Sequence, residues 1–209
     1  MLNNNGKLII FSAPSGAGKS TLIKEIIKNS SNDIELSVSA TTRNARKGEK
    51  HGIDYFFITE DEFNELKKKD SFIEFALVHG HHYGTLKSYV DEKIRKGVNI
   101  ILDIDVQGFK QIKDSVNYDS SIFILPPSLE ELRSRLIQRG HDSNEKIEER
   151  LKNAEIELTH AEIFDYIVLN DDFDRALKEL STIIFNGKIE IDSEKNLNLL
   201  SELLDKSTN

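Results

Sequence analysis

The 209-residue chain contains no cysteine, and this absence excludes whole classes of chemistry. Disulfide bonds, thiol catalysis and cysteine-ligated zinc all need a side chain that is missing here. No apolar run approaches the length that spans a membrane, and the first residues, MLNNNGK, lack the positive and apolar regions of a signal peptide. We therefore expect a soluble, cytoplasmic protein that has no membrane partner.

Basic residues are in the minority, with 28 Lys and Arg against 36 Asp and Glu, so the formal net charge is −8. A general nucleic-acid binder needs a basic face, so we expect no nucleic-acid partner. A nucleotide substrate is compatible with this charge, because a few local arginines decide such a contact. The length fits one domain, or a core with small inserted lobes, and leaves a monomer and a homo-oligomer equally open.

A glycine-rich stretch, SAPSGAGKST at residues 12–21, is the most informative part of the chain. The apolar segment before it, residues 7–11, favours a strand, and the segment after it has apolar residues at helical spacing. Strand, glycine-rich loop with Gly-Lys-Ser, and helix form the context of a phosphate-binding P-loop. The strict pattern begins with glycine, and Ala13 stands there in this chain. The alternative is a glycine-rich turn with a surface lysine.

Each residue type in this stretch has a physical role in holding an anion. Gly16 and Gly18 allow the backbone to bend and turn its N–H groups inward, and the start of a helix adds further donors. Lys19 can reach the β- and γ-phosphates, and the Ser20 hydroxyl can ligate Mg²⁺. The residues that we expect to bind ATP here are Ser12, Ala13, Pro14, Ser15, Gly16, Ala17, Gly18, Lys19, Ser20 and Thr21.

Buried-type strands alternate with helices along the rest of the chain. Strands are predicted at residues 34–39, 54–58, 72–78, 99–105, 121–125 and 166–170. Helices are predicted at 59–69, 88–96, 128–140 and 174–185, with a long helix around Arg150. HGHHYGT at 79–85 is interpreted as a turn, and leucines 197, 200 and 204 have helical spacing. The alternation predicts an α/β fold, a P-loop protein with a parallel five-stranded core sheet and helices on both faces.

Acidic and amide side chains lie at the predicted carboxyl ends of strands, where ligands bind in such sheets. Asp103 and Asp105 close an apolar strand, as an acid that helps to hold Mg²⁺ and its waters does. Acids that merely cap a strand are the alternative. We expect the P-loop, these two acids and Asn170 to converge on one site.

Two groups of arginines suit phosphate binding. Arg43 and Arg46 lie in a loop that we expect near Tyr55 and Tyr83, and arginine forks with tyrosine hydroxyls suit a dianionic phosphate. The arginines at 135, 139 and 150 flank a short polar loop that resembles a mobile lid, where they could stabilise a transferring phosphoryl group. Solvated arginines in the first group and helix-surface salt bridges in the second are the alternatives.

Glu74 is unexpected inside an apolar strand, because an unpaired buried carboxylate is costly. The N1–H and 2-amino groups of guanine would offer it two adjacent donors, whereas adenine would present an acceptor. An edge-strand glutamate that points to solvent is the alternative. The nearby histidines 79, 81 and 82 diverge in a turn and have no supporting acid, so we expect no metal site there.

Taken together, SAPSGAGKST, SATTRNARKGE, HGIDYFF, FIEFALVHGHHYGT, ILDIDVQG, RLIQRG and VLNDD resemble the guanylate kinase family, over about residues 7–185. The resemblance implies phosphoryl transfer from ATP to GMP and dGMP, with Mg²⁺ as the cofactor, in guanine nucleotide supply. It also implies a kinase domain at 5–185 and a helical tail at 186–209. Within the domain it implies a core (5–33, 89–125 and 165–185), a GMP-binding lobe (about 34–88) and a lid (about 126–164).

The same resemblance implies a role for each candidate residue. The base is read by Ser39, Glu74 and Thr85, and the GMP phosphate is held by Arg43, Arg46, Tyr55 and Tyr83, beside Glu49. Asp103 and Asp105 lie beside GMP and the magnesium-bound water, and Asn170 lies near the ATP base. The catalytic group comprises Lys19, Arg43, Arg135, Arg139, Arg150 and Asp103, and Ser20 ligates Mg²⁺, with Asp103 acting through water.

Two other functions remain open. A catalytically silent module of the same family would serve only in protein interactions, but such modules typically lose the P-loop lysine, and Lys19 is present. A different P-loop enzyme would differ in base specificity. The family often has proline where this chain has Ala45, which predicts a slightly less rigid loop.

Overall fold

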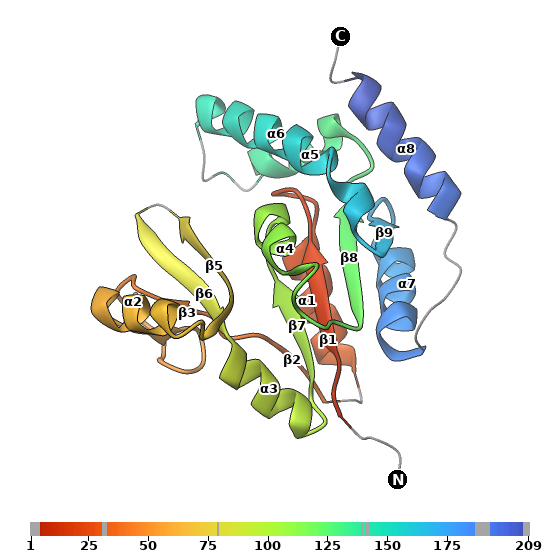
Figure 1. The fold of residues 1–209 in the computed structure, drawn as a ribbon. Helices are drawn as coiled ribbons and strands as arrows, with labels where there is room; N and C mark the ends of the chain where they lie inside the picture. The colour runs from red at the N-terminus through yellow and green to blue at the C-terminus, as the bar shows by residue number, and fades with distance from the viewer. Residues whose placement is uncertain are drawn as a thin grey trace. The chain divides into compact units, whose positions relative to one another are not determined.

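The computed structural model describes residues 5–30, 33–78, 80–138, 140, 143–186 and 193–206. The chain divides into two compact units, residues 1–8 with 31–119 and residues 9–30 with 120–209 (Figure 1). Its strands form a five-stranded sheet, in the order β2-β7-β1-β8-β9, and a four-stranded sheet, in the order β4-β3-β6-β5. The α/β fold with a five-stranded core sheet is therefore confirmed.

The unit with the glycine-rich loop has parallel strands at its centre. Its elements are β1 (Leu8–Ser12), α1 (Lys19–Asn29), β8 (Ser120–Leu125), α5 (Leu129–Gln138), α6 (Asn144–Leu158), η1 (Ala161–Ile163), β9 (Tyr166–Leu169), α7 (Phe173–Asn186) and α8 (Ser193–Lys206). Strand β8 pairs in parallel with both β1 and β9. Both β1 and β8 are buried along their whole length, which explains their continuous apolar sequences.

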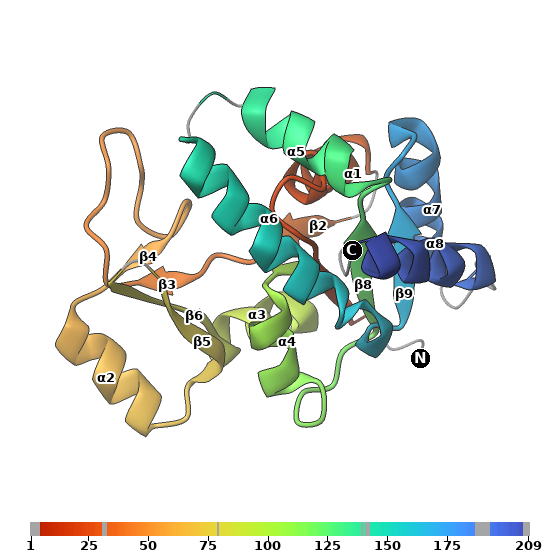
Figure 2. The same cartoon turned by 90° about the horizontal axis from the view of Figure 1, so that it is seen from above.

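Helices cover this part of the sheet through their apolar stripes. Helix α1 packs against α7, and α5 packs against α6, as Figure 2 also shows. The C-terminal helix α8 packs against β9 and α6, with Leu200 and Leu203 buried. The helical spacing of the leucines is matched by this helix over residues 193–206, although Leu197 is 37% exposed. No helix in the described ranges is long and apolar enough to cross a membrane.

The other unit contains the four-stranded sheet. Its elements are β2 (Ile34–Leu36), β3 (Ala40–Thr41), β4 (Phe56–Phe57), α2 (Glu60–Lys68), β5 (Phe72–Val78), β6 (His81–Leu86), α3 (Lys87–Arg95), β7 (Asn99–Asp103) and α4 (Val106–Ile112). Strands β2 and β7 pair in parallel, and β5 and β6 form an antiparallel pair. Phe63, Phe72 and Ala40 form a small apolar core between α2 and this sheet.

The predicted capping box of α2 is confirmed. The Thr59 N–H donates to Glu62 Oε2 at 2.7 Å, and the Glu62 N–H donates to Thr59 Oγ1 at 3.2 Å. Each side chain therefore satisfies a backbone donor that the first turn of the helix leaves without an intrahelical partner.

Three predictions from sequence are wrong. The supposed turn at residues 79–85 is largely strand β6, whose polar residues pair with β5, with Tyr83 opposite Ala76. The strand predicted at 34–39 ends at Leu36, and Ala40–Thr41 pairs instead with β4 and β6. The strand predicted to end at Asp105 ends at Asp103, because Asp105 caps α4, a helix that the apolar spacing did not indicate.

Candidate functional site

The glycine-rich loop connects β1 to α1 and is shaped by two glycines. Gly16 and Gly18 have φ angles of 101° and 97°, a region that favours glycine. The Ala17 N–H donates to the Pro14 carbonyl at 3.0 Å, which closes the turn. Ala13 is buried and is not among the residues with positive φ, so alanine is tolerated in place of the usual glycine.

The first turn of α1 presents the residues expected to meet phosphate. Gly18 is the N-cap of the helix, followed by Lys19, Ser20 and Thr21. Lys19 is half-buried, whereas Ser20 and Thr21 are exposed. The first turn contains no acidic residue, so the positive end of the helix dipole has no acidic side chain beside it in that turn.

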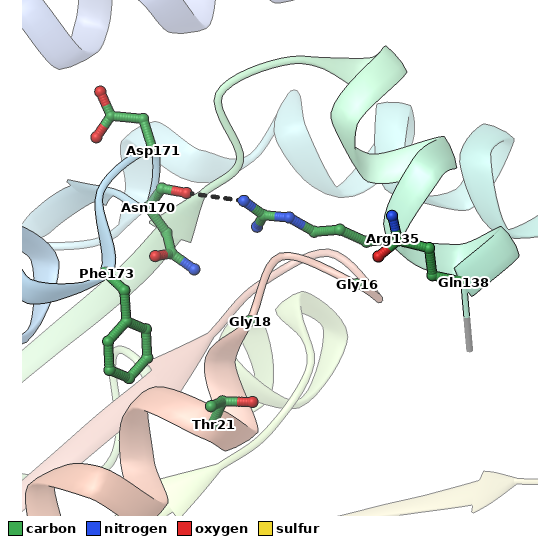
Figure 3. Close-up of a pocket in the computed structure, with 8 residues that line it drawn as sticks. All are labelled: Gly16, Gly18, Thr21, Arg135, Gln138, Asn170, Asp171 and Phe173. Carbon is green, nitrogen blue, oxygen red and sulfur yellow. Dashed lines mark hydrogen bonds between the residues drawn. The ribbon is translucent and has the colours of Figure 1, made fainter.

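Two residues from other elements hold the loop at Ala17. Asn170, which directly follows β9, donates from Nδ2 to the Ala17 carbonyl at 2.6 Å. Arg135 of α5 donates to the same carbonyl at 3.4 Å and to the Asn170 carbonyl at 3.3 Å (Figure 3). The predicted proximity of Asn170 to the P-loop is thus confirmed by a direct hydrogen bond.

The two helices α5 and α6 bring arginines to the loop. Arg135 also pairs with Glu131 one turn earlier, at 2.9 Å, so its surface salt bridge and its contact with the loop coexist. Arg150 of α6 lies with Nη1 3.5 Å from Ser15 Oγ. Arg139 lies outside the described residues.

A cavity of about 420 Å³ opens beside the loop. It is lined by Gly16, Gly18, Thr21, Arg135, Gln138, Asn170, Asp171 and Phe173 (Figure 3). Three of these residues were not predicted from the sequence: Gln138, Asp171 and Phe173. Phe173 is 38% exposed, and a large apolar side chain three residues after Asn170 is the signal that could have found it.

In the other unit, Arg43 is the centre of an aromatic and ionic cluster. Its guanidinium donates to both oxygens of Glu49, at 3.0 and 2.9 Å, and lies 5.4 Å from the centre of the Tyr55 ring. Glu49 also accepts the Arg46 N–H at 2.7 Å, and the Tyr55 and Tyr83 rings are 5.9 Å apart. The cluster therefore brings together the five residues predicted around the GMP phosphate.

These contacts shift the acid–base properties of the cluster. The hydrogen bonds to Glu49 raise the pKa of Arg43, and the same bonds, with the Arg46 N–H, lower the pKa of Glu49. Burial raises the pKa of Tyr55, so its hydroxyl keeps its proton and can donate to an anion. The cluster presents fixed cations and donors at neutral pH.

Glu74 is buried in β5, only 8% exposed, so the alternative that it points to solvent is wrong. Thr85 on β6 donates from Oγ1 to Glu74 Oε1 at 2.8 Å. Burial raises the pKa of the Glu74 carboxyl, and the nearby Asp105 charge raises it further. Asp105 itself accepts the Gly108 N–H at 2.7 Å. The structure thus brings Glu74, Thr85 and Asp105 together.

Two further predicted site residues, Ser39 and Asp103, are described by their position and exposure. Ser39 lies between β2 and β3 and is half-buried, and Asp103 is exposed at the end of β7. The convergence of Asp103 and Asp105 with the P-loop and Asn170 stays a prediction. In the described part of the chain, no three His, Cys, Asp or Glu side chains gather as a metal site would require.

A P-loop between a parallel strand and a helix, with arginines of two further helices against it, defines the chain as a P-loop phosphotransferase. The family model described as guanylate kinase matches residues 5–187. The chain belongs to the guanylate kinase family, whose members are ATP-dependent transferases that phosphorylate GMP.

Individual relatives agree with this assignment. The chain is 46% identical to the guanylate kinase of Escherichia coli (strain K12), over 95% of this chain and 98% of the relative. It is 43% identical to that of Caldanaerobacter subterraneus subsp. tengcongensis, over 95% and 96%. The crystal structure of guanylate kinase from Anaplasma phagocytophilum is similar, with a TM-score of 0.67, 36% identity and 92% of each chain covered.

Proposed function

We propose that this chain phosphorylates GMP and dGMP with ATP, and that Glu74 and Thr85 select the guanine base. The observation that carries the proposal is the buried Glu74 carboxylate, which has a threonine hydroxyl at 2.8 Å. A carboxylate accepts about four hydrogen bonds, so Thr85 leaves capacity for the N1–H and 2-amino donors of guanine. Ser39 would complete the contacts to the base. Adenine would oppose an acceptor to this carboxylate and leave it unsatisfied.

The cluster around Arg43 would hold the phosphate of GMP. Arg43 and Arg46 supply positive charge, and the hydroxyls of Tyr55 and Tyr83 supply neutral donors. Glu49 fixes the Arg43 fork through two hydrogen bonds, so the guanidinium is oriented before the substrate arrives. We assign these residues to a GMP-binding lobe at about residues 34–88.

The reaction is an in-line displacement. An oxygen of the GMP phosphate forms a bond to the γ-phosphorus of ATP while the bond to the β,γ-bridging oxygen breaks, giving GDP and ADP. The second pKa of a phosphate monoester is about 6, so the nucleophile is largely ionised at neutral pH and needs no general base. The main barrier is repulsion between anions, together with competing hydrolysis if water enters.

Cationic residues of the other unit would offset that repulsion. Lys19 would contact the β- and γ-phosphates, and Arg135, Arg139 and Arg150 would stabilise the transferring group from a lid at about residues 126–164. Arg150 already lies against Ser15 of the loop. Closure of the lid would exclude water.

Mg²⁺ fits the residues that are present. The described residues contain no acidic cage, and Ser20 is exposed in the first turn of α1. This suits an ion that keeps several waters and binds mainly through substrate phosphates and one or two protein oxygens. Ser20 would ligate it and Asp103 would act through water. When bound, Mg²⁺ neutralises charge on the β- and γ-phosphates.

An ADP-release assay with ATP and Mg²⁺ tests the proposal when it is run separately with GMP, dGMP, AMP, UMP and no acceptor. We expect turnover with GMP and dGMP only. In Glu74→Gln we expect the preference for GMP over AMP to fall by a large part of the roughly 10⁴-fold that such a polar site can supply. An unchanged preference would refute the role of Glu74.

The same assay separates the other functions. GMP binding without turnover would indicate a silent interaction module. ADP release without an acceptor would indicate a nucleoside triphosphatase.

A further inference from the structure

The peptide group between Ala17 and Gly18 is held from outside the P-loop. Its carbonyl oxygen accepts the Asn170 Nδ2–H at 2.6 Å and lies 3.4 Å from Arg135 Nη1. Asn170 is only 6% exposed, and its own backbone N–H donates to Leu125 of the neighbouring strand at 2.8 Å. The donor side chain is therefore fixed by the sheet, and it in turn fixes the loop.

The orientation of this one peptide group matters for anion binding. Because a trans peptide is planar, its C=O and N–H point in opposite directions. A carbonyl that is bound on the Asn170 side directs the Gly18 N–H to the opposite side. If the group rotated by half a turn, the carbonyl oxygen would take the place of the N–H donor and would repel a phosphate.

The residue after this peptide does little to hold it in place. The peptide precedes Gly18, whose φ of 97° lies in a region that glycine enters without a steric penalty, so the residue itself restrains the peptide weakly. A Cβ on Gly18 would lie 2.3 Å from Asn170 Nδ2. Glycine at this position is therefore required both by the backbone angle and by the close approach of the asparagine side chain.

We propose that Asn170, assisted by Arg135, is a positioning residue that locks the Ala17–Gly18 peptide so that the Gly18 N–H faces the phosphates of the donor nucleotide. This role differs from a contact between Asn170 and the ATP base, which the family resemblance implies. It rests on the proposed function only in taking the P-loop as the triphosphate site. Asn170 then acts on every ligand that bears the polyphosphate, whatever its base.

The two roles predict different results with inorganic tripolyphosphate, which has phosphates and no base. We would titrate a non-hydrolysable ATP analogue and tripolyphosphate into the full chain by calorimetry, with Mg²⁺ and with saturating GMP so that the Arg43 cluster is occupied. In Asn170→Leu, which cannot donate, we expect both ligands to bind about tenfold more weakly. Asn170→Asp retains the shape but loses the donor, and we expect the same or a larger loss.

Asn196 provides a matched control. It is also a buried asparagine, 7% exposed, and it also donates to a backbone carbonyl, that of Ile167 in β9, at 2.7 Å. Asn196→Leu thus removes the same kind of hydrogen bond, from the carbonyl of a β9 residue three positions before Asn170 and not from the P-loop. We expect it to lower the free energy of unfolding, as Asn170→Leu does, but to leave both affinities within about twofold.

A backbone signal tests the mechanism directly. We expect the Gly18 amide proton of the wild-type protein to shift downfield on binding tripolyphosphate, and this shift to be lost in Asn170→Leu. Weakened binding of the ATP analogue with unchanged tripolyphosphate binding would overturn the proposal in favour of a base contact. Unchanged binding of both ligands to folded variants would overturn it as well.

A separate variant tests whether the P-loop is the phosphate site at all. If Lys19→Met bound tripolyphosphate as well as the wild type does, the P-loop would not be the phosphate site. Both the donor half of the proposed function and the role of Asn170 would then be refuted.

Discussion

Two glutamates of the same unit, Glu49 and Glu74, show how surroundings give one residue type opposite properties. Glu49 accepts hydrogen bonds from Arg43 and Arg46, and its pKa is lowered, so it stays ionised and orients a cation. Glu74 is buried beside Asp105, and its pKa is raised. Hydrogen bonds therefore stabilise the charged form of Glu49, whereas burial destabilises the charged form of Glu74. A substrate with two hydrogen-bond donors would offset the free-energy cost of burying the Glu74 charge.

Because burying the charged Glu74 carboxylate destabilises the folded protein, we expect the protein to become more stable when that charge is removed. A carboxyl whose pKa is raised on folding contributes stability that is complete below its unfolded pKa and is lost as the pH rises through the folded pKa. We therefore expect Glu74→Gln to raise the free energy of unfolding of the substrate-free protein at pH 7. The gap to the wild type should close as the pH falls below the ordinary glutamate value of 4.5.

Urea unfolding of both proteins over the range from pH 4 to pH 8 measures this gap. A variant that is less stable than the wild type at pH 7 would contradict the prediction. Such a result would mean that the carboxylate is stabilised in the substrate-free protein.

The pair of Arg43 and Glu49 gives a second prediction at this scale. Glu49→Ala removes both hydrogen bonds that hold the Arg43 fork, so the guanidinium has to be ordered by the substrate itself. We expect the Kd for GMP to rise about tenfold, and the Kd for guanosine, which has no phosphate, to stay within about twofold. Calorimetric titrations measure both Kd values. If the affinities for GMP and guanosine fell equally, Glu49 would not act through the phosphate.

At the scale of elements, the strand that carries Thr85, a residue proposed to read the base, was the hardest to predict. The sequence HHYGTL is polar, with a glycine and two histidines, and such a composition is typical of a turn. It is nevertheless strand β6, because its backbone pairs with β5 at five positions. Long-range pairing decides such a segment, and a local pattern contains little information about it.

The glycine in β6 is explained by the same pairing. A Cβ on Gly84 would lie 2.9 Å from Phe72 Cδ1 and 3.0 Å from the Glu74 carbonyl oxygen. Gly84→Ala should therefore push β6 away from β5 and separate Thr85 from Glu74. We expect a loss of about 1–3 kcal/mol in the free energy of unfolding and a rise in the KM for GMP of at least tenfold.

A variant with a similar cost but no connection to the site serves as the control. Thr59→Ala removes the capping box of α2 in the same unit and should cost about 1 kcal/mol. We expect its KM for GMP to stay unchanged. If Gly84→Ala behaved in the same way, the close packing of β6 on β5 would be structural only.

At the scale of the whole molecule, the sequence predicted what depends on local chemistry. The P-loop, the capping box of α2 and the buried strands β1 and β8 all follow from short patterns, and the structure has them. The hydrogen bond from Asn170 to Ala17 joins residues 153 positions apart. No periodicity reports such a contact. Helix α4 was missed because it is short and begins directly at the acid that ends the preceding apolar run.

The division into two units leads to a prediction about ligand protection. The residues proposed to bind GMP lie within residues 31–119, and the P-loop, Asn170, Arg135 and Arg150 lie within 9–30 and 120–209. Each ligand at 100 times its Kd should stabilise the protein by about 2.7 kcal/mol, because it binds only the folded state. We expect the slowing of amide hydrogen exchange to differ between the two ligands.

Hydrogen exchange measured by mass spectrometry can follow both units in one experiment. GMP alone should slow exchange in β5, β6 and the Arg43 loop, and a non-hydrolysable ATP analogue alone should slow it in the P-loop and α5. In Glu74→Gln the protection by GMP should fall while that by the ATP analogue remains. Protection of the P-loop by the ATP analogue should in turn fall in Asn170→Leu. A GMP signal confined to the P-loop would contradict the division of the substrate sites between the two units.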